Sequence, residues 1–160
     1  MSMMGLKSWI PSIIVVLGWA IVYQIQALQV RRKILREEIE KTRDVIIELG
    51  KTAARFHMNP YSVEDHMSIT SLLTDIERRY SMFPKIAKAR RRFLPNAVEV
   101  GKIEVDPKHL VGLRQAITGT HFDDSAALAL PHSDSQFKDI SSATRQMILV
   151  IDGVFVAALD

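Results

Sequence analysis

Five histidines and one His-Asp-Ser segment are the residues of this 160-residue sequence whose types suit acid–base or metal chemistry. His57 and His66 flank Asn59-Pro60, so a turn there would bring them together, with Asp65 as the nearest further ligand. The remaining histidines are isolated, none is paired at i,i+4 with a carboxylate in the zincin manner, and the chain has no cysteine. We therefore predict turn-exposed histidines and no metal site; the isolated ones are His109, His121 and His132.

The segment His121-Phe122-Asp123-Asp124-Ser125 holds the residue types of a catalytic triad. Triads are assembled in space and need an oxyanion hole, and no G-x-S-x-G elbow is present. An aspartate as N-cap of a short helix over 125–130 explains the segment better. The sequence also lacks a P-loop and a G-x-G-x-x-G motif, so we predict no catalytic or cofactor site and no enzyme.

Two groups of basic residues are the sharpest candidate site. Basic residues near a bilayer attract anionic headgroups by about 1 kcal/mol each. The competing interpretations are a solvated helix face or pairing with nearby carboxylates. Nucleic acid is disfavoured as a partner because the runs lack interleaved aromatic and glycine residues. The candidate anionic-lipid contacts are Arg31, Arg32, Lys33 and Arg36 in the first group and Lys85, Lys88, Arg90, Arg91 and Arg92 in the second.

The first basic group follows a segment without charge, SWIPSIIVVLGWAIVYQIQALQV, at residues 8–30. At 1.5 Å per residue it spans the ~30 Å hydrocarbon core of a bilayer. Trp9 and Tyr23 suit the two interfaces. A cleaved signal peptide and a buried core helix are the alternatives. The apolar run is too long for a signal peptide, and Ala27 offers a poor cleavage context. We predict an uncleaved transmembrane anchor.

The basic flanks predict the orientation of this anchor. Lys7 stands alone before it, whereas Arg31–Lys33, Arg36 and Lys41 follow it. The positive-inside rule therefore places the N-terminus outside and residues 31–160 in the cytoplasm, with a bacterial inner membrane as the expected location.

An apolar stripe runs from the anchor into the charged sequence. Steps of four and three residues are the a/d seam of a heptad repeat, and here the stripe is wider than a strict zipper. This favours packing against a helix of the same chain, while a parallel homo-oligomeric coiled coil stays open. The seam is Ile21, Ile25, Leu28, Arg32, Leu35, Ile39, Thr42, Ile46, Leu49, Ala53 and Phe56.

A second helix is predicted over 63–82, ending before Phe83-Pro84, with Ser62 and Asp65 resembling a capping box. The short loop favours an antiparallel hairpin with the first helix. The two helices would be roughly 36 Å and 32 Å long. The hairpin would therefore return the second basic group to the lipid surface.

The rest of the chain is predicted to be largely helical. Residues 85–93 suit a further helical piece, and 97–105 suit a small strand or an extended loop. Asp106-Pro107 starts a helix that ends at Gly119. Residues 138–159 carry a helical stripe, with Asp139 or Ser141 as cap, and the alternative is a β-hairpin around Asp152-Gly153.

These patterns predict a mainly α protein. Its parts are an N-terminal segment and anchor (1–30) and a cytoplasmic helical domain (31–160). The domain divides into a helical hairpin (31–83), a basic and extended connector (84–105) and C-terminal helices (106–160).

The expected function is that of a single-pass membrane protein whose helical domain is an interaction or scaffold module. Its partners would be the bilayer, anionic headgroups and another protein, and a homo-oligomer is compatible with the seam. The alternative is a membrane-perturbing effector, phage- or defence-related, that oligomerises through its anchor.

Overall fold

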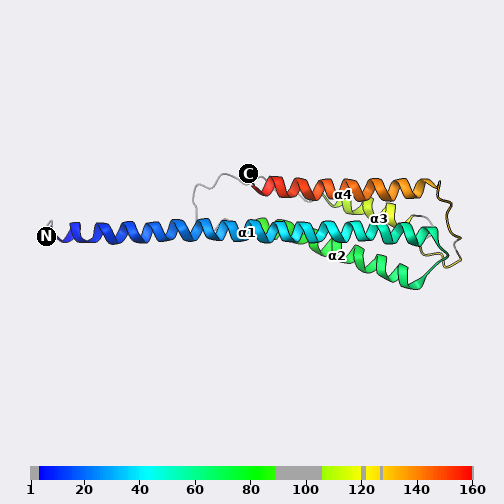
Figure 1. Cartoon of the computed structure of the whole chain (residues 1–160), viewed down its shortest axis with the longest axis horizontal. Helices are drawn as coiled ribbons and strands as arrows, with labels where there is room; N and C mark the ends of the chain where they lie inside the picture. The colour runs from blue at the N-terminus through cyan, green and yellow to red at the C-terminus, as the bar shows by residue number, and fades with distance from the viewer. Residues whose placement is uncertain (1–3, 89–105, 120–121, 127, 160) are drawn as a thin grey trace. The chain divides into compact units, whose positions relative to one another are not determined.

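The computed structural model describes residues 4–88, 106–119, 122–126 and 128–159, with backbone alone for 4–13, 28, 31, 86–88 and 157–159. The protein is mainly helical, as predicted. Across these ranges the chain forms four helices and no strand (Figure 1). They are α1 (Met4–Met58), α2 (Val63–Lys88), α3 (Pro107–Thr118) and α4 (Ser135–Leu159).

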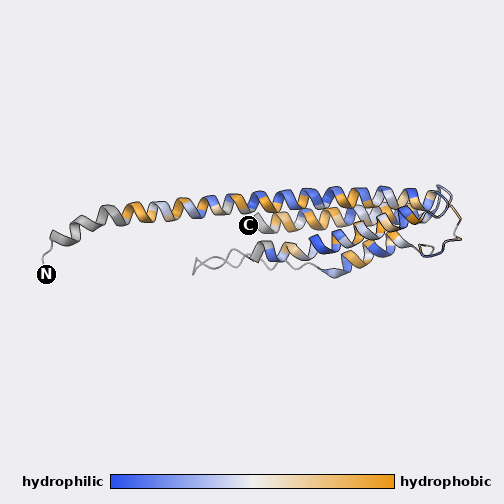
Figure 2. Cartoon of the chain, turned by 90° about the horizontal axis from the view of Figure 1, so that it is seen from below, coloured by the Kyte–Doolittle hydropathy of each residue, from blue (hydrophilic) through white to orange (hydrophobic). Residues whose placement is uncertain are grey.

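The chain divides into two units, Met1–Ile34 and Leu35–Asp160. In the first unit α1 is apolar, and the side chains of residues 14–26 are all exposed. Trp19 and Tyr23 have exposed fractions of 71% and 73%, although both are large aromatic residues. Within the described residues, α1 is the helix long and apolar enough to cross a membrane, judged by length and composition (Figure 2).

In the second unit all four helices contribute to one hydrophobic core. The seam of α1 is buried here at every step from Leu35 to Phe56. Its polar position, Thr42, is fully buried, and its hydroxyl donates to the carbonyl of Glu38 at 2.6 Å. Because that hydrogen bond satisfies the hydroxyl, a threonine is tolerated among apolar neighbours.

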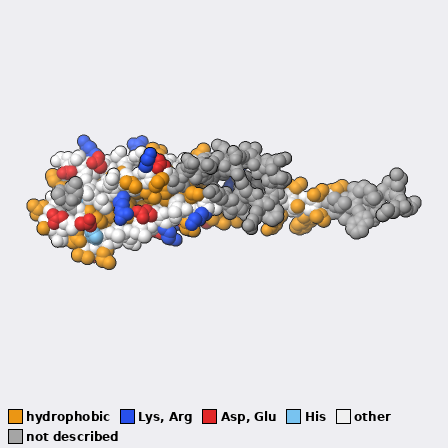
Figure 3. All heavy atoms as spheres, turned by 180° about the vertical axis from the view of Figure 1, so that it is seen from behind, with side chains coloured by type: hydrophobic (Ala, Val, Ile, Leu, Met, Phe, Trp, Pro, Cys, Tyr) orange, Lys and Arg blue, Asp and Glu red, His pale blue; other side chains and the backbone are white. Residues whose placement is uncertain are grey.

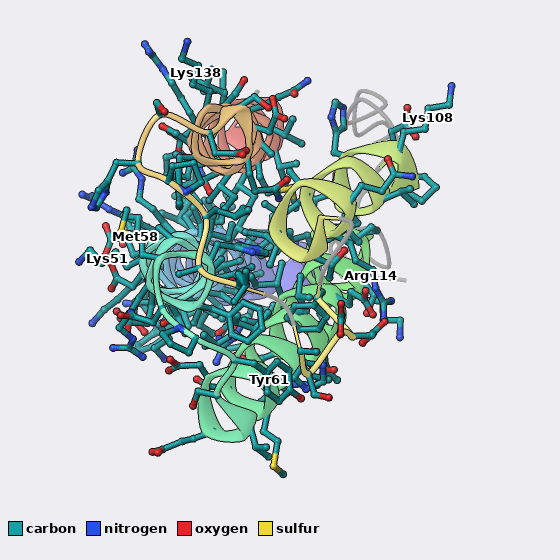
Figure 4. The ribbon with its side chains drawn as sticks, turned by 90° about the vertical axis from the view of Figure 1, so that its right-hand side faces the viewer. Lys51, Met58, Tyr61, Lys108, Arg114 and Lys138 are labelled. Carbon is teal, nitrogen blue, oxygen red and sulfur yellow. The ribbon has the colours of Figure 1, made fainter. Side chains whose placement is uncertain are left out.

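The other helices present matching stripes to this core. Apolar residues three and four apart share one helix face, so each helix buries one side and exposes the other. Figure 4 shows this arrangement along the helix axes, with charged side chains such as Lys51, Lys108 and Lys138 pointing outward. The buried residues are Ile69, Leu73, Ile76, Tyr80 and Phe83 in α2, Leu113 and Ile117 in α3, and Ile140, Met147, Ile151 and Val154 in α4.

Ion pairs join α1 to α2 at two levels. Arg79 of α2 pairs with Glu38 of α1, and Arg55 of α1 pairs with Asp65 of α2 at 2.7 Å. The first pair joins the late part of α2 to the early part of the buried α1 stripe. The second pair joins the end of α1 to the beginning of α2.

α1 and α4 also approach closely. Arg43 pairs with Asp152 at 2.8 Å. A Cβ atom added to Gly50 would lie 2.9 Å from Oγ1 of Thr144, so glycine is what allows the two backbones to come this near. This contact places α4 against the face of α1 that carries Arg43 and Gly50.

The predicted start of α2 and the two predicted ends of α3 are confirmed. The Asp106 carboxylate accepts from the Lys108 backbone N–H at 2.9 Å, Pro107 is the first helical residue, and Gly119 ends α3 with φ of 57°. The Asp65 backbone N–H donates to Ser62 Oγ at 3.3 Å, as a capping residue requires.

Three local predictions are wrong. α2 does not end before Phe83-Pro84 but continues to Lys88, with Pro84 inside the helix. The side chain of Phe83 is fully buried, and this packing outweighs the backbone hydrogen bond that Pro84 cannot donate. Residues 85–88 therefore belong to α2, while 89–93 and the predicted extended segment 97–105 lie outside the described residues.

The predicted short helix over 125–130 does not form in the described part of that segment, where 125 and 126 lie in a turn and 128–130 are irregular. Asp124 does cap locally, because its carboxylate accepts from the Ala126 N–H at 2.9 Å, but the bond closes a turn rather than starting a helix. α4 begins at Ser135, before the predicted Lys138, and Asp134 rather than Asp139 or Ser141 accepts from the Gln136 N–H. The alternative β-hairpin is excluded, because Asp152-Gly153 lies within α4.

Candidate functional site

The first basic group lies on α1 across the boundary between the two units. Arg32 and Lys33 are exposed, and only the backbone of Arg31 is described. Arg36 is exposed and pairs with Glu40 at 3.0 Å, one helical turn later. Exposed pairs of this kind contribute little to stability, so Arg36 stays available to a stronger anionic partner.

The second basic group lies at and beyond the end of α2. Lys85 is exposed, and Lys88 is the last residue of the helix. Arg90, Arg91 and Arg92 lie outside the described residues. The return of this group to the lipid surface therefore stays a prediction.

His57 is not the turn-exposed side chain that the sequence suggested. It is buried, with an exposed fraction of 5%, and its Nε2–H donates to the Ile117 carbonyl at 2.9 Å. Because a carbonyl only accepts, the bond places the proton on Nε2. His57 thus ties the end of α1 to the end of α3, a structural role.

His66 and the 122–124 segment do come together. The imidazole of His66 stacks on Phe122 with ring centroids 4.2 Å apart, and its Nε2 lies 3.4 Å from the Asp123 carboxylate. Phe122 is buried, and its ring also packs against that of Phe56, with the ring centroids 5.3 Å apart. Phe122 of this segment is therefore a hydrophobic plug packed against His66 and Phe56, and the carboxylates of Asp123 and Asp124 are exposed; His121 lies outside the described residues.

A surface groove lies beside this plug, between α2 and α3. Its volume is 630 Å³, and α2 contributes His66, Thr70, Thr74 and Glu77 to its walls. We call this feature the α2–α3 groove; its other polar walls are Arg114 and Thr118 of α3 and Asp123 and Asp124 of the following segment.

The pair Arg114–Glu77 crosses the groove, with Nη1 and Oε1 3.4 Å apart. Figure 4 shows Arg114 on the side of α3 that faces α2. This groove could not be predicted from the sequence, because its walls come from three separate segments. Only the 3.6-residue spacing of the polar residues on α2 could have indicated a common face.

A network of four charged residues lies on the α1–α2 side of the second unit. Asp75 accepts from Arg79 Nε at 2.7 Å and from Arg78 at 2.6 Å, and Arg79 also donates to Glu38. The hydrogen bonds from Arg79 and Arg78 hold the pKa of Asp75 below its usual value. With every acid paired to a base, the network stabilises the packing of α2 on α1 rather than offering a reactive group.

Acidic and basic side chains are scattered among apolar and other side chains on the visible face of the second unit (Figure 3). Among the described residues no group of three or more His, Asp or Glu side chains is arranged to hold a metal ion. Comparisons with protein families, with curated proteins and with solved structures found no match to this chain.

Proposed function

We propose that this chain is a single-pass membrane protein whose anchor is the apolar part of α1 and whose bundle is an interaction or scaffold module. The observation that carries the proposal is the exposure of residues 14–26, including Trp19 and Tyr23, in a stretch without charge. Contiguous apolar surface of this extent does not stay in water and is covered by lipid or protein. The length of the stretch matches a bilayer.

The proposed arrangement of the first two helices is an antiparallel hairpin. The ion pairs Glu38–Arg79 and Arg55–Asp65 support it, because residues early in one helix pair with residues late in the other. The seam positions of α1 from Leu35 to Phe56 are all buried within the chain itself, so none of them is left exposed for a sister subunit. The homo-oligomeric coiled coil over that region is therefore the weaker proposal.

The orientation that we propose follows from the basic residues after residue 30, which favour a cytoplasmic bundle. The chain has no cysteine, so single cysteines can be introduced as unique labels. An impermeant maleimide on intact cells should label Ser2→Cys and not Ser135→Cys. The reverse pattern would overturn the orientation, and extraction of the protein by alkaline carbonate would overturn the anchor.

The scaffold role is testable by proximity labelling of the full chain in its native membrane. The matched control is Ile46→Asp, which places a charge at a fully buried core position and leaves the anchor intact. Neighbours that are labelled by the wild type and lost in the control would support the bundle as the binding module. Identical neighbours for both proteins would show that the anchor alone determines the location and would contradict the proposal.

A further inference from the structure

The α2–α3 groove has the lining of a binding site for a small cation. We propose that it binds an aliphatic diamine, with one ammonium group at Glu77, the other at Asp123 and Asp124, and the methylene chain between them. This inference concerns residues of the second unit alone, so it does not depend on the membrane anchor.

The hydroxyl groups of the groove are available as hydrogen-bond acceptors. Thr70, Thr74 and Thr118 each donate their proton to the backbone carbonyl four residues earlier in their own helix, at 2.9 Å in all three cases. A hydroxyl oxygen has two lone pairs besides its proton, so these three oxygens can still accept. An ammonium group, with three donors and no acceptor, complements them, whereas another acceptor does not.

The charges of the groove favour the same ligand. Three carboxylates, Glu77, Asp123 and Asp124, line it against one guanidinium, that of Arg114, and the imidazole of His66. With His66 neutral the formal charge of the lining is −2. An anion would therefore be repelled.

The chain's own cation already occupies part of this site. Arg114 reaches Glu77 across the groove at 3.4 Å, with side-chain exposed fractions of 61% and 42%. A pair this long and this exposed contributes little to stability. A ligand ammonium can therefore replace the guanidinium at Glu77 at small cost, while Arg114 swings into solvent.

The floor of the groove suits a hydrocarbon chain. Leu73 and Phe122 lie beneath it and are 7% and 8% exposed. The opposite face of the groove is open, and its 630 Å³ is within the range of roughly 300–1,000 Å³ of small-molecule sites. A diamine bound here would pass its methylene chain over the small exposed parts of Leu73 and Phe122, with its second ammonium group at Asp123 and Asp124.

The proposal is tested by titrating the full chain, in neutral-detergent micelles, with 1,5-diaminopentane in an isothermal calorimeter. Two probes of equal length, 1,5-pentanediol and pentanedioate, provide a neutral and an anionic control. We expect saturable binding of the diamine and no binding of either control. Absence of diamine binding at 10 mM, or equal binding of the diol, would overturn the proposal.

Paired variants distinguish the groove from general surface charge. Glu77→Gln should weaken diamine binding at least tenfold, and Arg114→Gln should strengthen it severalfold because the competing guanidinium is gone. The matched controls are Glu64→Gln and Arg78→Gln, two exposed α2 residues that do not line the groove. Both should leave the dissociation constant within twofold of the wild type. Controls that shift binding as much as the groove variants would assign the effect to net charge and overturn the site, and circular dichroism verifies that each variant is folded.

Discussion

One apolar periodicity runs along α1, but the residues around it differ between the part of α1 in the first unit and the part in the second. In the first unit Ile21 and Ile25 occupy seam positions and are 59% and 50% exposed. The other residues of 14–26, on every side of the helix, are exposed as well. In the second unit the seam positions Ile46 and Leu49 are fully buried, while charged residues cover the opposite face. A helix that is apolar all round requires apolar surroundings on every side, from a membrane or from protein, whereas an amphipathic helix requires only a neighbouring helix on one side. The same seam thus has two environments, and the flanking residues decide which one applies.

The largest expected effect comes from replacing a seam isoleucine by aspartate, first in the second unit and then in the first. Ile46→Asp would bury an unpaired charge in the core, at a cost of roughly 3–5 kcal/mol. That is a large share of the 5–15 kcal/mol of a typical domain, so thermal unfolding followed by circular dichroism should show a strongly lowered melting temperature of the bundle.

Ile21→Asp is the matched change in the apolar part of α1. It should leave the melting temperature of the bundle unchanged and oppose membrane insertion by about 2.5–3.5 kcal/mol. Membrane fractionation measures the second effect. A bundle that melts early in Ile21→Asp would show that the apolar part is required for the core, and the distinction between the regions would be lost.

Truncation of a leucine to alanine should likewise destabilise the bundle in the second unit but not when it is made in the first unit. Leu49→Ala leaves a cavity in a fully buried site and should lower the free energy of unfolding by about 2–5 kcal/mol. Leu17→Ala, at a site that is 57% exposed, should change it by less than about 0.5 kcal/mol. Chemical denaturation of both variants checks this difference, and equal losses would contradict it.

The glycines of α1 offer a finer comparison. Gly50→Ala would place a methyl group 2.9 Å from Thr144 Oγ1, and we expect a net cost of about 1–2 kcal/mol after the better helix propensity of alanine is included. Gly18 has no neighbour within 4 Å, so Gly18→Ala should be neutral for the bundle. In the Gly50→Ala background, Thr144→Ala removes the clashing atoms and should restore most of the lost stability. No rescue would show that α1 and α4 do not meet at this point.

The smallest expected effect is a pH dependence confined to the bundle. Because the Asp75 pKa is lowered in the folded state, its stabilising contribution is present above the unfolded value, about 3.9, and is lost as the pH falls through the folded pKa. Asp75→Asn should therefore flatten the acid limb of the stability profile by less than about 1 kcal/mol, since the pairs are partly exposed. The apolar segment 8–30 contains no carboxylate to titrate in this range. Denaturant midpoints between pH 2 and pH 6 measure the change, and an unchanged acid limb in Asp75→Asn would contradict the network.

The sequence predicted most of the helices because their signals are local. Heptad spacing, Asp106-Pro107 and the Ser62 cap all act within a few residues. The errors arose where tertiary packing outweighs local rules, as at Pro84, where burial of Phe83 keeps the helix intact. The burial of His57 could not be predicted either, because its partner Ile117 is 60 residues away.

The candidate groove was still less accessible to prediction. Glu77, Arg114 and Asp123 share no motif, and only the packing of α3 beside α2 brings them to one surface. The basic groups, by contrast, are evident in the sequence as runs of charge, but a run does not reveal what it contacts.

The most direct test of the two environments is a spin-label accessibility scan along α1, with single cysteines from residue 14 to residue 56 in lipid nanodiscs. We predict high oxygen and low nickel-chelate accessibility on every side of residues 14–26. From residue 35 onward we predict a 3.6-residue periodicity with minima at Ile39, Ile46, Leu49 and Ala53. High nickel-chelate accessibility over residues 14–26, or the same periodic protection in both regions, would contradict the account.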